Sequence, residues 1–179
     1  MTEQLLARSI HRQLFSGPDI NVFAILDGAS VPHLLRSLHQ HRPEHVCLWR
    51  GDLAADLAEV APHLVRLEPD ADFTRWLVEE GWGEHWGIFA AAETGLREMR
   101  LHFRRFVTVY DPDDRPVYFR FYDPRVLRSY LPTCNAEEIR ALLGPVCFCA
   151  AEGEDPNVLL RFQANRGSLE KQEVVLVAA

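Results

Sequence analysis

Hydrophobic and polar positions follow two alternating periods along this chain. Residues 21–26 form a short apolar run with turn residues on both sides, which predicts a buried strand. Residues 31–38 repeat apolar side chains at the three- and four-residue spacing of a helix that packs on a sheet. Short apolar runs at 46–49, 63–67 and 86–91 predict further strands. The pattern therefore predicts strands and helices in alternation.

The remaining elements continue this alternation without an internal repeat or a low-complexity linker. Further helices are predicted over residues 2–15, 52–59, 73–77, 95–106, 124–131 and 135–143, and further strands over 108–110, 117–121, 146–150, 158–162 and 174–177. The strand, helix and strand of residues 21–49 predict a βαβ unit, whose two strands run parallel. We therefore expect an α/β protein with a mixed β-sheet, parallel βαβ units and a hairpin, flanked by helices, in one domain over 1–179.

The most informative stretch begins at the hairpin. Apolar and polar side chains alternate over residues 117–121, which predicts a strand that is buried on one face. Asp123 is placed to cap a helix that Pro124 opens, since proline at the first helical position loses no hydrogen bond. Arg120 and Arg125 stand on either side of Asp123. The sequence thus predicts a charged cluster at a strand end, where sites in α/β proteins gather.

Composition narrows the classes of partner. The chain has 19 basic and 26 acidic residues, a net charge of −7, and Lys171 is its only lysine. Nucleic-acid binding usually needs concentrated positive charge, so we expect no nucleic-acid partner. The chain lacks an apolar run long enough to span a membrane and its N-terminus lacks the pattern of a secretory signal. We therefore expect a cytoplasmic protein with no membrane partner.

Motifs for enzyme chemistry are missing from the sequence. There is no nucleophile elbow, no phosphate-binding loop and no dinucleotide fingerprint. His39, His41 and His45 cluster, but they lack the spacing of a helical ligand pair and a completing acidic residue or cysteine. Asp27 ends a predicted strand and precedes a glycine, which is typical of a turn residue. We therefore expect no catalytic residue, no cofactor and no metal site.

Several segments together resemble a known family. The run Phe119–Leu127 resembles the signature of the adaptor, or effector-chaperone, family of bacterial type VI secretion systems. Phe23–Ala29, Ala61–Val65 and Leu101–Phe106 are similar to further landmarks of that family, in the same order. The resemblance covers residues 20–150, which leaves a short C-terminal extension at 151–179.

The resemblance implies an adaptor and not an enzyme. Members bind a cognate toxic effector in the producing cell and help to load it onto the spike protein of the secretion apparatus. The residues we expect to contact these two partners are charged or aromatic: Arg120, Tyr122, Asp123, Arg125, Trp82 and Arg104. For Trp82 the alternative role is core packing, and for the charged cluster it is internal ion pairing.

Two other functions remain open on the sequence alone. One is a small metal-dependent hydrolase or nuclease built on Asp27 and Asp123, which would need an acidic concave site. The other is a small-ligand binding protein, which would gain thermal stability from a metabolite.

Overall fold

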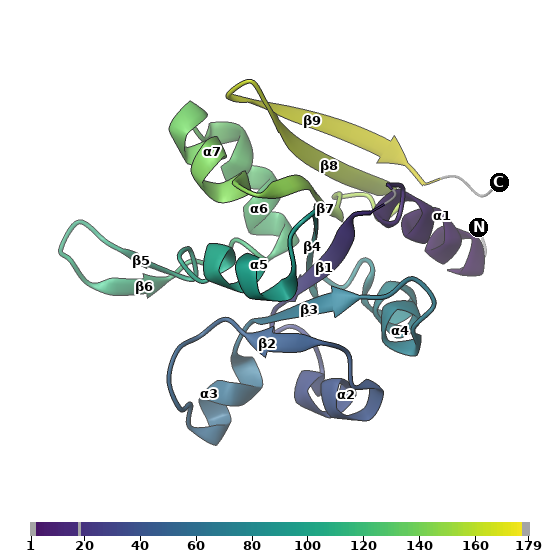
Figure 1. Ribbon diagram of the computed structural model, residues 1–179, viewed down its shortest axis with the longest axis horizontal. Helices are drawn as coiled ribbons and strands as arrows, with labels where there is room; N and C mark the ends of the chain where they lie inside the picture. Colours follow the sequence, from purple (N-terminus) through teal and green to yellow (C-terminus); the bar gives the residue numbers. More distant parts are fainter. Residues whose placement is uncertain (1–2, 18, 177–179) are drawn as a thin grey trace.

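The computed structural model describes residues 3–17 and 19–176 as a seven-stranded sheet with helices on both faces and a separate two-stranded hairpin (Figure 1). The helices are α1 (Glu3–Leu14), α2 (Leu34–His41), α3 (Ala55–Val60), α4 (Asp72–Gly81), α5 (Leu96–Phe103), α6 (Pro124–Tyr130), the short 3-10 helix η1 (Leu131–Thr133) and α7 (Ala136–Leu143). The strands are β1 (Asn21–Leu26), β2 (His45–Cys47), β3 (His63–Leu67), β4 (Gly87–Ala92), β5 (Thr108–Tyr110), β6 (Pro116–Tyr118), β7 (Val146–Glu152), β8 (Val158–Asn165) and β9 (Ser168–Val175).

The strand order of the main sheet is β2-β3-β1-β4-β7-β8-β9, and every neighbouring pair is antiparallel. The predicted mixture of helices and strands and the β5–β6 hairpin are confirmed. The predicted parallel βαβ units are wrong. β1 and β2 do run in the same direction, but β3 lies between them, with Val65 opposite Ala24 on one side and His45 on the other.

Burial of both faces of the sheet explains why the sequence pattern predicted parallel strands. Phe23 and Ile25 of β1 point into a core formed with α5, α6 and α7, whereas Val22, Ala24 and Leu26 pack in a second core with α1, α2 and α4. A strand buried on both faces is apolar throughout, which is typical of parallel sheets. Here helices cover both faces of an antiparallel sheet and produce the same sequence pattern.

The buried strand predicted over 117–121 is also wrong. β6 ends at Tyr118, and all of its residues are exposed. The chain then turns, because the backbone N–H of Asp123 donates to the carbonyl oxygen of Arg120 at 3.0 Å. Phe121 reaches the core from this turn, with only 1% of its surface exposed. The alternating apolar pattern therefore comes from a buried turn that follows an exposed strand.

Two helix starts follow the sequence signals closely. The side chain of Asp123 caps α6 by accepting the backbone N–H of Arg125 at 2.9 Å, and Pro124 occupies the first turn. Asn135 and Glu138 form the expected capping box at the start of α7. These short-range predictions are confirmed. α6 and its preceding turn are therefore fixed by contacts encoded within a few residues.

The C-terminal segment extends the sheet. β8 and β9 follow β7 and form the outer strands on that side (Figure 1). Residue 177 of the strand predicted at 174–177 and residue 2 of the first predicted helix lie outside the described residues. Within residues 3–17 and 19–176, no helix has the length and apolar character that a bilayer crossing needs.

Candidate functional site

Four charged side chains form a continuous row where β1 ends, and we call this row the ion-pair chain: Asp27, Arg120, Asp123 and Arg125. Arg120 donates from Nε to Oδ2 of Asp27 at 2.9 Å, and its Nη2 lies 3.8 Å from Oδ2 of Asp123. Arg125 donates from Nε and Nη2 to the two carboxylate oxygens of Asp123 at 3.0 and 2.7 Å. The turn after the hairpin is thus tied to the end of β1 by two-pronged contacts.

The carboxylates of the ion-pair chain are buried, whereas its guanidinium groups reach solvent. Asp27 and Asp123 are 1% and 3% exposed, and about half of each arginine side chain is exposed. Burial alone would raise the pKa of Asp123, but hydrogen bonds from Arg125 and the charges of Arg125 and Arg120 together lower it. The hydrogen bond to Asp27 likewise raises the pKa of Arg120. Both effects favour the charged forms of Asp123 and Arg120.

Tyr122 occupies the interior side of the same turn. Its side chain is 2% exposed and belongs to the core formed with α5, α6 and α7. Burial, followed by the charge of Asp27, raises the pKa of its phenol well above the ordinary value. Tyr122 therefore packs beneath the ion-pair chain in a neutral form and offers no surface of its own.

Arg104 lies next to β2 and is engaged with the backbone. Its Nε donates to the carbonyl oxygen of Leu48 at 3.0 Å, and its Nη2 donates to those of Cys47 and Trp49 at 3.1 and 2.8 Å. Burial, and then the nearby arginine charges, lower its pKa. Arg104 thus satisfies three carbonyl groups where the chain leaves the sheet.

Trp82 lies in the loop between α4 and β4, apart from the ion-pair chain. Its indole Nε1 donates to the carbonyl oxygen of Pro156 at 2.7 Å, and its ring stacks on Phe89 with centroids 6.3 Å apart. The side chain is half-buried. Of the six residues expected to bind partners, the structure therefore brings together Arg120, Tyr122, Asp123 and Arg125, and places Arg104 and Trp82 in separate contacts.

Glu152 is a buried charged residue that sequence reasoning missed. It ends β7 and is 4% exposed. Its carboxylate accepts the backbone N–H groups of Gly83 and His85 at 2.6 and 3.1 Å and also contacts the His85 ring. Glu152 thus holds the loop that carries Trp82. The available signal was a lone acidic residue at the end of an otherwise apolar strand.

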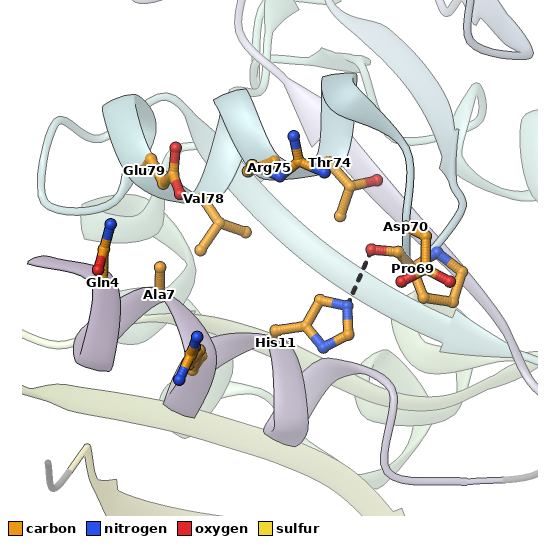
Figure 2. A pocket seen from close by; sticks show the side chains of 10 residues that line it. Gln4, Ala7, His11, Pro69, Asp70, Thr74, Arg75, Val78 and Glu79 are labelled. Atoms are coloured by element: carbon orange, nitrogen blue, oxygen red, sulfur yellow. Dashed lines mark hydrogen bonds between the residues drawn. The ribbon is translucent and has the colours of Figure 1, made fainter.

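Two grooves differ in their charge. The helix groove between α1 and α4 has a volume of about 380 Å³ and is lined by side chains of both signs, among them Arg8, Asp70, Arg75 and Glu79 (Figure 2). In it, His11 donates from Nε2 to the carbonyl oxygen of Pro69 at 2.9 Å. It contains none of the residues expected to bind partners.

The second groove, which we call the hairpin groove, has a volume of about 410 Å³ and lies between α3 and the β5–β6 hairpin. Its lining is aromatic, aliphatic and basic: Leu48, Trp49, Arg50, Leu53, Leu57, Arg104, Arg105, Val107, Thr108, Tyr110 and Tyr118. Among the residues that the structure describes, no carboxylate lines it. Of the residues expected to bind partners, it contains Arg104.

The fold and these contacts define an α/β protein whose conspicuous charged cluster is paired within the chain. The chain belongs to the DUF4123 family, described as a domain of unknown function, because the family model matches residues 22–141, more than half of the chain. The matched range includes the ion-pair chain and the whole hairpin. The family is known in adaptors of type VI secretion effectors. No curated protein and no solved structure gives a significant match.

Proposed function

We propose that this chain is an adaptor that binds a cognate toxic effector in the cytoplasm of the producing cell and helps to load it onto the spike protein of a type VI secretion system. The observation that carries the proposal is family membership over residues 22–141. The effector and the spike protein are then its two partners, and its work consists of binding, without a chemical step.

The state of the two candidate carboxylates supports binding over hydrolysis. A metal-dependent hydrolase would need Asp27 and Asp123 to offer oxygen atoms to a cation. Oδ1 of Asp27 accepts the backbone N–H of Ala29 at 3.0 Å, and Oδ2 is held by Arg120. Both oxygens of Asp123 are held by Arg125. Guanidinium groups at these positions repel a cation, which favours the adaptor over the hydrolase.

The helix groove favours a second candidate function, small-ligand binding. Its volume of about 380 Å³ lies within the range of small-molecule sites. A metabolite that raises the melting temperature of the purified chain would support this function. The same screen with Arg75→Gln, in the wall of that groove, would separate specific binding from a general solvent effect.

Co-purification tests the adaptor function. The tagged chain, recovered from its producing cell in mild salt, should bring with it a toxin-like protein or a spike protein. Arg125→Gln should reduce this recovery, because the exposed half of Arg125 is available to an acidic partner. Arg75→Gln is the matched control, since Arg75 also pairs with an aspartate, Asp72 at 3.0 Å, on another surface. Recovery of no partner with a folded wild-type chain would overturn the proposal.

A further inference from the structure

The β5–β6 hairpin exposes an unusual amount of apolar surface. It is a separate two-stranded sheet that projects from the body of the molecule (Figure 1). Val109, Tyr110, Val117 and Tyr118 are 36%, 70%, 41% and 62% exposed. Leu57 of α3, across the groove, is 43% exposed. Tyr110, Tyr118 and Leu57 line the groove, whereas Val109 and Val117 lie on the opposite face of the hairpin. The exposed apolar side chains that face the groove mark a site of interaction.

The hairpin is also incomplete as a sheet. Each strand has three residues, and an isolated pair of strands is marginally stable in water. The contacts that hold it include the stack of the Tyr118 ring on that of Trp49, with centroids 4.6 Å apart, and the pair of Arg115 with Asp111 across the tip at 2.9 Å. An added third strand would complete the backbone hydrogen bonds along its open edge.

The charge of the groove determines what kind of strand fits. Arg50, Arg104 and Arg105 line it, and none of them forms an ion pair within the described part of the chain. Burial, and then the charges of Arg100 and Arg50, lower the pKa of Arg104. In a chain with a net charge of −7, this is a local excess of positive charge. An acidic segment would neutralise it.

One polar group beside the groove lacks a partner. The indole Nε1 of Trp49 is buried, and no hydrogen-bond acceptor reaches it among residues 3–17 and 19–176. A buried donor without an acceptor costs about 1–3 kcal/mol. Among residues 3–17 and 19–176 no acceptor offsets this cost, so an oxygen atom of a bound segment that reached the indole would lower it.

We infer that the hairpin groove binds an extended, acidic segment of a partner protein that carries apolar side chains. The segment lies along the hairpin as a third strand. Its apolar side chains contact Tyr110 and Tyr118, and its carboxylates pair with Arg50 and Arg105. The inference deepens the proposed adaptor function and rests on it for the identity of the partner. A single-stranded nucleic acid fits less well, because Leu53, Leu57 and Val107 make part of the groove aliphatic, whereas single-strand binding relies on basic and aromatic side chains.

Fluorescence anisotropy in low salt tests the chemistry directly, with three labelled probes. The first is a short peptide in which glutamate alternates with leucine and phenylalanine, the second replaces glutamate by glutamine, and the third is a single-stranded oligothymidylate. We expect the acidic peptide to bind about tenfold more tightly than the other two. Equal binding of the two peptides, tighter binding of the oligonucleotide, or no binding of the acidic peptide would overturn the inference.

Variants locate the binding. Arg50→Glu and Tyr118→Ala, both at exposed side chains, should each weaken the acidic peptide about tenfold. Arg8→Glu, in the helix groove, is the matched control and should leave it unchanged. Circular dichroism establishes that each variant is folded. Uniform binding by all three variants would overturn the placement of the site.

The partner co-purified in the test of the adaptor function separates the two claims. If the wild-type chain and the Tyr118→Ala variant recover that partner equally, the groove inference fails and the adaptor function stands. If the folded wild-type chain recovers no partner, the adaptor function fails whatever the peptide does. Self-association of the wild-type chain that is lost on Tyr118→Ala would show that the occupant is a second copy and overturn the inference.

Discussion

The ion-pair chain and the hairpin groove are two arginine-rich regions at the same end of the sheet. Leu26 of β1 and Cys47 of β2 both pair with His63 of β3, so the two strands end at the same level on either side of β3. In the ion-pair chain, Arg120 and Arg125 each have a buried carboxylate as partner. The arginines of the groove have none among the residues described. Ion pairs within the protein hold its shape, whereas an arginine without a carboxylate partner, such as Arg50, keeps its charge available to another molecule.

The largest expected effect on stability comes from removing a carboxylate of the ion-pair chain. Asp123→Ala removes the cap of α6 and both hydrogen bonds from the Arg125 side chain. We expect a loss of about 2 kcal/mol in the free energy of unfolding, since Arg125 is half-exposed and can be rehydrated. Urea unfolding at neutral pH measures it. Asp113→Ala is the control, because Asp113 forms an equally short pair with Arg115 on the exposed hairpin tip. Equal losses in the two variants would contradict a special role for burial.

A decrease in pH should also destabilise the ion-pair chain, with a smaller effect on the free energy of unfolding than Asp123→Ala. The pKa of Asp123 is lowered in the folded state, so the folded chain binds this proton less readily than the unfolded chain. Its contribution to stability is present above the ordinary aspartate pKa of about 4 and is lost as pH falls through the lower folded value. Asp123→Asn should therefore reduce stability at pH 7 and lose this difference towards pH 2. A constant difference across that range, in urea unfolding, would contradict an ionised Asp123.

The smallest effect on stability is expected in the hairpin groove. Tyr118→Ala removes the stack on Trp49 from a side chain that is 62% exposed. An aromatic pair contributes about 0.5–1.5 kcal/mol beyond its buried area, and an exposed one lies at the lower end. A thermal melt should show a smaller decrease in Tm than for Asp123→Ala. A decrease as large would show that the hairpin is an integral part of the fold.

Local features of the fold could be predicted from the sequence. The caps at Asp123 and Asn135 depend on residues at most three positions away, so the pattern contains all the needed information. The position of β3 between β1 and β2 could not be predicted from such local patterns. It depends on which strands pair, and apolar runs buried on both faces are equally suited to parallel and antiparallel neighbours.

The candidate site shows the same limit. The cluster around Asp123 was predicted because its members lie within six residues of one another. Its partner Asp27 is 93 positions from Arg120, and no local pattern connects the two. Arg104 was expected to contact partners because the helix predicted over residues 95–106 is rich in arginine. Sequence could not show that three carbonyl groups already hold its guanidinium.

The strand order also determines when, during synthesis of the chain, each strand can pair with its neighbour. β4 pairs with β1 on one side and with β7 on the other, where Phe89 lies opposite Ala150. Residues 93–145, which hold the hairpin and four of the helical segments, must be made before β7 exists. Until then the apolar β4 is an open edge on the nascent chain. Between the synthesis of β4 and that of β7, the growing polypeptide therefore carries an apolar strand with an unpaired edge, which favours aggregation.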